Sequence, residues 1–412
     1  MSQRDMIDRL RGMIREMEQR RPAEEDSFPA PRLPAIPRLG PLASVRDVTP
    51  SSSQVEDREH FRVIHAVFPR ANPEELKMPP EDALPALLSL EPRLTGLDGW
   101  LYMDIETTGL AGAATVAFLV GFGEWVEGDF HVTQLFLKDR SSEEFLLEEV
   151  EKRFSGRQTL VTFNGKAFDV PVMRGRFAIS GMRPPEFAPA HLDLLSLVRN
   201  MGKRPEFGQS LKEAVRRFTG TVRDGDIPGH LIPALYFIYE RDGDASILDP
   251  VVKHNRLDIM DMACLVYVLG HVASGDLSRG DAHALGGAGK LHLRKGNLDL
   301  ARRCLMTALA GMPTDCGDAA IQNRLLGQVL RRQGDYCGAA EAFSRVVSSD
   351  RAKDEDYLWL ARCYELGPKD LPRSCDIISA ALSRYEACGA YPPPSLVKRL
   401  RRLEKLRSKS ER

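Results

Sequence analysis

Residues 101–106 read Leu-Tyr-Met-Asp-Ile-Glu, a short apolar run that carries two acids at its end. The run is typical of a buried strand, and successive side chains of a strand point to opposite faces of the sheet. Asp104 and Glu106 are two residues apart, so they are expected to face the same side. Carboxylates in apolar surroundings are costly unless a cation pairs with them, and magnesium or manganese prefers such oxygen ligands. A solvated strand end is the alternative explanation for this pair taken alone.

The sequence around this run predicts a mixed sheet covered by helices. Two β-rich stretches follow it and are joined by Glu-Gly-Asp at 127–129, which is a hairpin signal. Ser141, with Glu144 three residues later, predicts the start of a helix with a capping box. Strands followed by alternating helices and strands indicate an α/β fold. We expect strands at residues 61–68, 101–106, 115–125, 130–137, 159–163 and 191–195, and helices at 210–218, 231–240 and 247–271.

Two further acids lie far along the chain but in comparable positions. Asp169 comes just beyond the predicted strand 159–163, at the opening of a helix. Asp258 lies inside a later helix, with His254 one turn earlier on the same face. Taken singly, Asp169 could be favoured by the helix dipole and His254 could lie on a solvated surface. Taken together, four acids from three segments suit a two-metal centre, in which paired ions activate water and stabilise the leaving oxygen of a phosphodiester.

These residues, in this order, make the chain resemble the DEDD nucleases, which carry three exonuclease motifs. The resemblance is closer to the YprB-type ribonuclease-H-like proteins and covers about residues 60–272. It implies an α/β ribonuclease-H-like mixed sheet flanked by helices, followed by an all-α tetratricopeptide-like repeat domain. The matching motifs are Asp-Ile-Glu-Thr-Thr-Gly at 104–109, Asn-Gly-Lys-Ala-Phe-Asp at 164–169, His-Leu-Asp-Leu-Leu at 191–195, Asp-Ile-Pro-Gly at 226–229 and His-Asn-Arg-Leu-Asp at 254–258.

The resemblance implies a role for each residue of this centre. The implied ligands of two Mg²⁺ or Mn²⁺ ions are Asp104, Glu106, Asp169 and Asp258. His254 would be the general base that takes a proton from the attacking water, a task suited to a group that titrates near neutral pH. In the DEDD classes the base is a histidine five residues before the last acid or a tyrosine four before it, whereas this histidine is four before. Lys253 occupies the other position and is a poor base unless it is desolvated.

Other residues in these motifs are candidates for binding the substrate. The assigned positions are Thr107 after the first acids, and Asn164 and Lys166 in the second motif. Asn164 could instead shape the junction of strand and helix, and Lys166 could lie on a solvated helix face. Asp193 is expected to hold a supporting position rather than to bind an ion. Further basic residues that could contact phosphates are Arg174, Arg176, Arg183, Lys203 and Arg204.

The sequence after residue 275 has a wholly helical and repetitive pattern. Leu-His-Leu-Arg-Lys-Gly-Asn-Leu-Asp-Leu-Ala at 291–301 resembles Val-Leu-Arg-Arg-Gln-Gly-Asp-Tyr-Cys-Gly-Ala at 329–339. This pattern looks like tetratricopeptide repeats, whose usual period is about 34 residues. Three regions are therefore expected: an N-terminal helix and a disordered Pro-rich linker over 1–59, a ribonuclease-H-like exonuclease domain over 60–274, and helical repeats with a basic tail over 280–412.

The composition limits the classes of binding partner and the cellular compartment that we expect for the protein. The chain has 412 residues and a net charge of −1, which argues against a tail-driven polyanion binder but leaves a local basic groove open. All seven cysteines lie in its second half without a CxxC pair, so free thiols in a reducing compartment are expected. The charged N-terminus has no signal-peptide core, and no stretch reaches 18 uncharged apolar residues. We therefore expect a cytoplasmic protein without a membrane segment.

The sequence predicts a metal-dependent 3′–5′ exonuclease that hydrolyses single-stranded DNA or RNA by a two-metal mechanism. The repeats could recruit a protein partner or extend the substrate groove. The competing interpretation is a scaffold that binds a protein through its repeats, with a nuclease-like domain of weak or no turnover. Cutting within a strand by the same ions is a third possibility. Four mutually repelling carboxylates favour catalysis, because a retired site has no physical reason to keep them.

Overall fold

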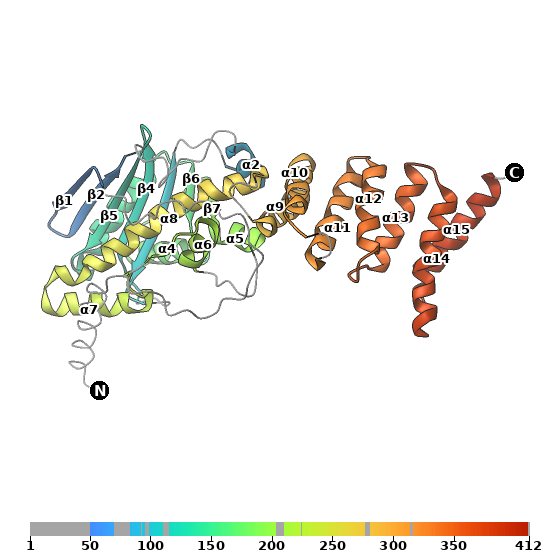
Figure 1. The fold of residues 1–412 in the computed structure, drawn as a ribbon. Coiled ribbons are helices and arrows are strands. Elements are labelled where there is room, and N and C mark those ends of the chain that lie inside the picture. Colours follow the sequence, from blue (N-terminus) through green and yellow to red (C-terminus); the bar gives the residue numbers. More distant parts are fainter. Residues whose placement is uncertain are drawn as a thin grey trace, which may run out of the picture. The chain divides into compact units, whose positions relative to one another are not determined.

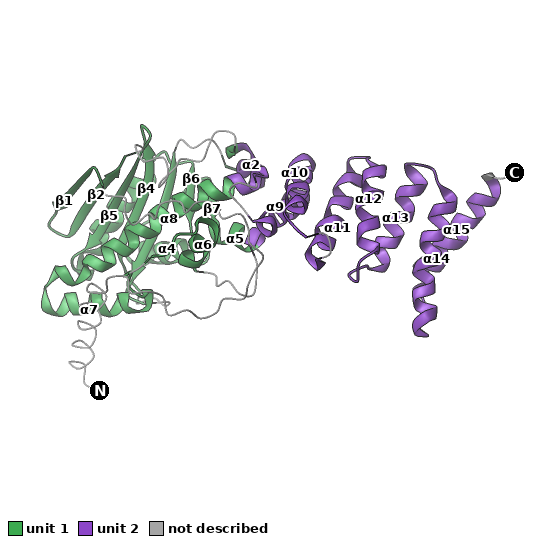
Figure 2. Cartoon of the chain, in the orientation of Figure 1, with its two compact units in different colours: residues 1–84, 91–199, 203–270 green, residues 85–90, 200–202, 271–412 purple. Residues whose placement is uncertain are grey.

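The chain folds into two compact units, coloured green and purple in Figure 2. Unit 1 contains residues 1–84, 91–199 and 203–270, and unit 2 contains residues 85–90, 200–202 and 271–412. A computed structural model describes residues 50–69, 83–91, 93–94, 99–109, 115–202, 210–223, 225–276, 281–313 and 316–410. The expected N-terminal helix and most of the expected linker lie outside the described residues.

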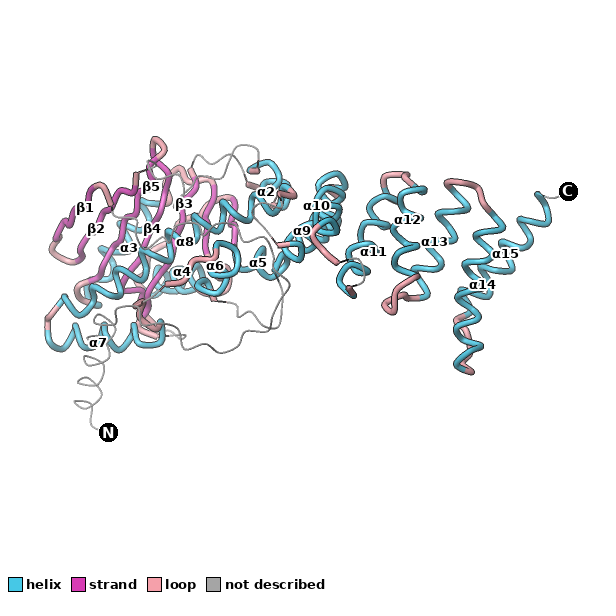
Figure 3. The backbone as a smooth tube through the Cα atoms, in the orientation of Figure 1, coloured by secondary structure: helices cyan, strands magenta, loops and turns pink. Residues whose placement is uncertain are grey.

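Unit 1 is built on a mixed sheet of seven strands, drawn as arrows in Figure 1 and in magenta in Figure 3. The strands are β1 (Ser52–Asp57), β2 (Phe61–Phe68), β3 (Trp100–Thr107), β4 (Ala117–Val126), β5 (Asp129–Leu137), β6 (Thr159–Thr162) and β7 (Ala190–Asp193). Their spatial order is β1-β2-β5-β4-β3-β6-β7. β3 is antiparallel to β4 and parallel to β6, so it lies where the two parts of the sheet meet. The expected mixed α/β sheet is confirmed.

The hairpin between β4 and β5 forms where the sequence predicts it. Glu127 and Gly128 have φ angles of 52° and 95°, and pairing starts at Val126 and Asp129. Positive φ at both turn residues gives the backbone twist that a two-residue hairpin needs. The hairpin therefore fixes the register of the central strands.

Helices cover both faces of this sheet. The described α-helices before residue 275 are α2 (Leu84–Leu90), α3 (Glu143–Arg153), α4 (Asp169–Ile179), α5 (Leu194–Gly202), α6 (Leu211–Thr219), α7 (Ile232–Asp242) and α8 (Asp249–Ser274). Of these, α2 belongs to unit 2 from Pro85 on and takes no part in covering the sheet. Gly121 of β4 faces α8, which crosses the sheet (yellow in Figure 1). Phe118 and Phe122 point to the opposite face, because side chains alternate along a strand. There they contact Tyr236 of α7 and Phe154 at the end of α3, with ring centroids 4.1 and 6.0 Å apart.

The helix α8 is apolar around most of its circumference. The segment Ala245–Ser274, which includes α8, is long and apolar enough to cross a membrane by length and composition. Of its most apolar 18-residue stretch, 83% is buried within the protein. A helix that is covered on nearly all sides must be apolar all round, so packing in the core accounts for this composition.

Two local features differ from the sequence-based expectation. Ser52–Asp57 lies in the range expected to be linker, yet it pairs along β2 as a strand with all six residues exposed. Its order comes from backbone pairing, which no apolar pattern announces. The predicted capping box at Ser141 is wrong, because the Asp139 carboxylate accepts a hydrogen bond from the Ser141 amide at 2.8 Å. A 3₁₀ turn at Arg140–Ser142 results, and α3 begins only at Glu143.

The described residues of unit 2 form helices joined by turns, which confirms the second part of the expected architecture. Its helices are α9 (Ala282–Lys295), α10 (Leu298–Ala310), α11 (Gly317–Arg332), α12 (Tyr336–Val347), α13 (Asp354–Leu366), α14 (Leu371–Cys388) and α15 (Pro394–Ser410). Each packs on the next along the chain. Gly296 and Gly334, in the turns that repeat in the sequence, have φ angles of 87° and 83°. The assignment of these helices to the tetratricopeptide class stays a prediction.

Two short segments from far upstream belong to unit 2. Asn297 of unit 2 donates a side-chain hydrogen bond to the Ser89 carbonyl of α2 at 3.0 Å. A Cβ atom added to Gly287 would lie 2.6 Å from both the Asn200 carbonyl oxygen and the Met201 Cα atom. Residues 85–90 and 200–202 therefore pack with the first helices of unit 2, α9 and α10. All seven cysteines lie in described residues, and no disulfide joins any two of them.

Candidate active site

Two of the predicted acids leave β3 on the same face. Asp104 and Glu106 are partly exposed, whereas Met103 and Ile105 beside them are buried. This is the alternation that the sequence predicts. The side-chain amide of Asn255 on α8 donates to the Asp104 carboxylate at 2.8 Å and to the Asp104 carbonyl at 3.2 Å. The acids therefore lie on the face of the sheet that α8 crosses.

The close approach of α8 to the sheet depends on a glycine. Gly121 pairs with Asp104 across the β3–β4 ladder. A Cβ atom on Gly121 would lie 2.1 Å from Asn255 Oδ1 and 2.4 Å from Ile259 Cδ1. Asn255 is held from its other end by Gln134, whose amide donates to Asn255 Oδ1 at 2.9 Å. With both ends of its amide bonded, Asn255 holds the Asp104 carboxylate in one orientation.

The third acid begins α4, as the sequence predicts. Asp169 is the first residue of this helix and is 5% exposed. The turn before it contains Asn164 with a φ of 68°. The backbone N–H groups of Asn164 and Lys166 donate to the Asp193 carboxylate at 2.9 and 3.2 Å. Asp193 thus anchors the strand–helix turn, which is the supporting position expected of it.

The fourth acid and the predicted base lie on α8. His254, Asp258 and Asp261 are spaced by four and three residues, so they share one side of the helix. His254 is 7% exposed, and its Nε2 atom lies 3.6 Å from Asp258 Oδ2. Lys253, the other candidate base, is exposed to solvent. Of the two candidate bases, His254 is therefore the one whose side chain lies beside an acid of the predicted set.

The four acids Asp104, Glu106, Asp169 and Asp258, called the acid cluster below, act on one another electrostatically. Removal from solvent raises the pKa of Asp104 well above its usual range, and the other three carboxylates raise it further. Removal from solvent also raises the pKa of Glu106 to about 8 and that of Asp169 to about 7. Asp258 contributes to both of these shifts. Acids that oppose one another's ionisation in this way are typical of functional sites.

The segment between α6 and α7 supplies a cation that sequence reasoning missed. Arg223 Nη1 donates to Asp258 Oδ1 and lies 3.2 Å from Asp226 Oδ2. Arg223 Nε donates to Asp261 at 2.8 Å. Asp226 belongs to a motif of the family resemblance, but its local pattern gives it no role. The available signal was the spacing of Asp261, which follows His254 and Asp258 on one helix face.

Asp226 also orients the predicted base. Its Oδ1 atom lies 2.7 Å from His254 Nδ1, and its Oδ2 atom lies 2.7 Å from Lys212 Nζ. Burial alone would raise the pKa of Asp226, but His254 and Lys212 bring it below the usual value. Burial alone would lower the pKa of His254, but Asp226 and Asp258 raise it. One side of the imidazole is thus fixed, and Nε2 is directed toward the acid cluster.

The chemistry of the acid cluster suits Mg²⁺ or Mn²⁺, because these ions bind carboxylate oxygens. In the described part of the chain, no group of three or more His, Cys, Asp or Glu side chains is arranged to hold an ion as it stands. Arg223 is bonded to Asp258, and Asn255 is bonded to Asp104. The donor types and their mutual repulsion fit a divalent cation, and ion binding would require these contacts to rearrange.

The residues assigned to substrate binding are placed differently from one another. Asn164 and Lys166 are exposed on the turn before α4. Thr107 is 8% exposed, and its hydroxyl donates to the Gly109 carbonyl at 2.6 Å. Thr107 therefore shapes the turn after β3, and the other two residues form the accessible pair.

Arg176 is not placed as a phosphate contact. It is 9% exposed, and its Nε atom donates to the Glu143 carboxylate of α3 at 2.7 Å. This buried pair ties α4 to α3. Lys203 and Arg204 lie outside the described residues.

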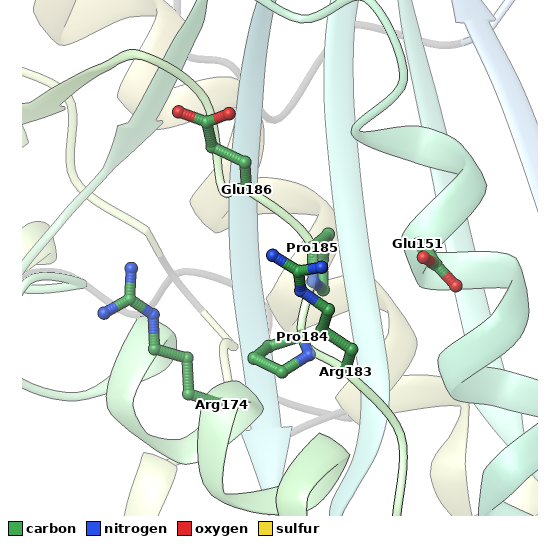
Figure 4. Close-up of a pocket in the computed structure, with 6 residues that line it drawn as sticks. All are labelled: Glu151, Arg174, Arg183, Pro184, Pro185 and Glu186. Atoms are coloured by element: carbon green, nitrogen blue, oxygen red, sulfur yellow. The ribbon is translucent and has the colours of Figure 1, made fainter.

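Two other predicted basic residues line an open depression, shown in Figure 4. It is lined by Glu151, Arg174, Arg183, Pro184, Pro185 and Glu186. The depression contains no residue of the acid cluster. Its acids and arginines are mixed, so its charge does not favour a polyanion.

Comparison with known proteins points to the same part of the chain. A curated protein of Bacillus subtilis (strain 168), the uncharacterized protein YprB, is 34% identical over 170 residues, which are 40% of this chain and 40% of the relative. The family B DNA polymerase of the hyperthermophilic archaeon Pyrobaculum calidifontis is similar with a TM-score of 0.35 and 13% identity, over 67% of this chain and 51% of that chain. That similarity is too low to carry an argument. Residues 101–269 match the family model of the RNase_H superfamily, and this segment holds the whole acid cluster.

Proposed function

We propose that this protein is a metal-dependent nuclease that acts as a 3′–5′ exonuclease on single-stranded DNA or RNA. The observation that carries the proposal is the convergence of the acid cluster, whose members come from β3, α4 and α8 and repel one another. The match of residues 101–269 to the RNase_H superfamily supports nuclease chemistry. A purely structural cluster would be expected to pair each acid with a cation.

The residues of this chain divide the chemistry among them. Two Mg²⁺ or Mn²⁺ ions held by the acid cluster would activate the attacking water and stabilise the leaving 3′ oxygen. His254 would accept the proton of that water at Nε2. Asp226 would hold Nδ1 and stabilise the imidazolium that results, as a carboxylate does beside other histidines that act as general bases. Asn164 and Lys166, exposed beside the third acid, would contact the substrate.

In unit 2, the last helix offers a second surface for nucleic acid. α15 buries Leu396 and Leu403. Its opposite side carries five exposed basic residues, which fall within about 100° of arc at the 3.6-residue period of a helix. They are Lys398, Arg401, Arg402, Lys405 and Lys409. A basic stripe of this kind complements a phosphate backbone, and a solvated helix face is the alternative.

The test is cleavage of 5′-labelled DNA and RNA oligonucleotides by the full chain with Mn²⁺ or Mg²⁺. We expect stepwise shortening from the 3′ end, complete inhibition by EDTA, and no cleavage by Asp104→Asn. Glu148→Gln removes an exposed acid of the same unit and should cleave as the wild type does. Internal fragments instead of a ladder would assign an endonuclease.

Wild-type protein that cleaves none of these substrates would refute the nuclease and favour a scaffold. Undiminished cleavage by a folded Asp104→Asn would refute the assignment of the site. Circular dichroism of each variant separates loss of chemistry from loss of fold.

A further inference from the structure

Arg223 is a nearly buried cation within a group of carboxylates. Its side chain is 4% exposed, although it comes from a segment without helix or strand. Nη1 donates to Asp258 Oδ1 and lies 3.2 Å from Asp226 Oδ2. Nε donates to Asp261 Oδ2 at 2.8 Å, and Nη2 donates to the same oxygen. One guanidinium therefore serves three acids.

The acids on the two sides of this guanidinium differ in accessibility. Asp261 is 1% exposed and lies outside the predicted ligand set, so its bonds with Arg223 form a buried structural pair. Asp258 has 15% of its side chain exposed and belongs to the acid cluster. A guanidinium stays charged at any physiological pH. Arg223 therefore neutralises Asp258 for as long as the two are in contact.

Arg223 and a divalent ion would compete for the same carboxylate. The guanidinium occupies Asp258 Oδ1, so an ion that binds through this oxygen meets Arg223 directly. A positive charge at hydrogen-bond distance from the ligand oxygen also repels an incoming cation, and the partly buried setting strengthens this repulsion. Release of Asp258 need not free the whole side chain, because Nε and Nη2 bind Asp261 independently of Nη1.

We propose that Arg223 is the resident counter-ion of Asp258 in the metal-free protein, and that a divalent ion must displace it from Asp258 to bind the acid cluster. The inference rests on the proposed function, because it takes Asp258 to be a metal ligand. The opposite role is support, in which Arg223 holds Asp258 in place for the ion. Removal of Arg223 strengthens metal binding under competition and weakens it under support.

The test is calorimetric titration of the full chain with Mn²⁺, comparing wild type with Arg223→Gln and Arg223→Lys. We expect Arg223→Gln to bind Mn²⁺ about 5–150-fold more tightly, the range of coupling between two ligands that affect each other's affinity. Arg223→Lys keeps the charge but loses the two-sided guanidinium, so it should fall between. Arg183→Gln removes an exposed guanidinium from the same unit and should bind as the wild type does.

Thermal unfolding gives a second readout and verifies the fold of each variant. Without metal, Arg223→Gln should melt below the wild type, because Asp258 and Asp261 lose their cation. Mn²⁺ should raise its melting temperature more than that of the wild type, since tighter binding stabilises the folded state more. If Arg223→Gln does not fold, Arg223→Lys carries the comparison.

The outcomes separate the two proposals. Equal or weaker Mn²⁺ binding by the folded Arg223 variants overturns the competition and leaves the nuclease proposal intact. Failure of the wild type and every variant to bind Mn²⁺ overturns the metal centre on which both depend.

Discussion

Unit 1 and unit 2 both remove acids from solvent, but they surround them in opposite ways. In unit 2, Asp356 is 1% exposed and accepts hydrogen bonds from Arg324 at 2.7 and 2.8 Å and from the Lys353 amide at 2.8 Å. In unit 1, the Asp104 carboxylate is bonded by the neutral amide of Asn255, and other carboxylates face it. In the first arrangement a cation and an N–H donor pair with the carboxylate charge. In the second, neighbouring carboxylates repel it.

This difference distinguishes acids that support the fold from acids that are candidates for chemistry. A buried acid with a full set of donors is part of the scaffold. Acids that raise one another's pKa weaken the folded state when they ionise, so their presence needs another explanation. Asp258 stands between the two cases, because it meets both Arg223 and the acid cluster.

The largest effect is expected at the acid cluster. Glu106→Gln keeps the shape of the side chain and removes its charge. Cleavage should fall by about 10³-fold, the loss typical of deleting one group that stabilises a transition state electrostatically. The metal-free protein should become more stable, because a repelling acid is gone. Initial rates with Mn²⁺ and thermal unfolding in EDTA measure the two effects. A variant that loses stability as well as cleavage would place Glu106 with the acids that support the fold.

Asp356→Asn should show the reverse profile. The change leaves Arg324 without its partner charge, so the free energy of unfolding of unit 2 should drop by about 3–5 kcal/mol. Cleavage of short oligonucleotides by the folded protein should be unchanged. Urea unfolding measures the loss, with the exposed Glu341→Gln as control, which should stay within about 0.5 kcal/mol of wild type. Equal stability of the two variants would remove the contrast between the units.

Gly121→Ala tests the packing that positions Asp104. The added methyl would meet Asn255 and Ile259, so we expect a loss of about 1–3 kcal/mol in the free energy of unfolding. Cleavage should fall as well, because Asn255 is displaced from Asp104. Gly175→Ala in α4 is the matched control: its methyl meets nothing within 4 Å, and it should gain about 0.5–1 kcal/mol. Unchanged cleavage in Gly121→Ala would show that Asn255 is not needed to orient the acid.

The smallest effect is expected on α15. The double variant Lys398→Gln/Lys405→Gln should bind single-stranded nucleic acid a few times more weakly. Its plot of log affinity against log salt should be flatter by about 0.7 per lost phosphate contact. Fluorescence anisotropy at several salt concentrations measures both. Lys290→Gln/Arg302→Gln removes the same charge from exposed positions of unit 2, and an equal effect of the two double variants would leave α15 as a solvated face.

The parts of the site that follow a regular period were predictable from the sequence. Alternation along β3 places Asp104 and Glu106 on one face, and the helical period places His254 and Asp258 on one side of α8. Asp169 was predictable because it begins the helix that follows β6 and a short turn. Local geometry determines each of these positions.

The rest of the site depends on long-range contacts. Arg223 and Asp226 come from an irregular segment, whose path is fixed by the acids it meets rather than by its own pattern. The sequence gives Asn255 no feature that distinguishes it from other helix residues, because its contact with the sheet depends on the distant Gly121. β1 has an exposed side chain at every position, so its strand pairing carries no hydrophobic signal.

The participation of α2 and residues 200–202 in unit 2 has a practical consequence for dividing the protein. A fragment that starts after Ser274 would lack Ser89 and Asn200, which lie against Asn297 and Gly287 of unit 2. The matching N-terminal fragment would keep α2 without its partners. No single cut leaves unit 2 whole. After limited proteolysis near residue 275, the two fragments should therefore remain bound to each other until denaturant is added.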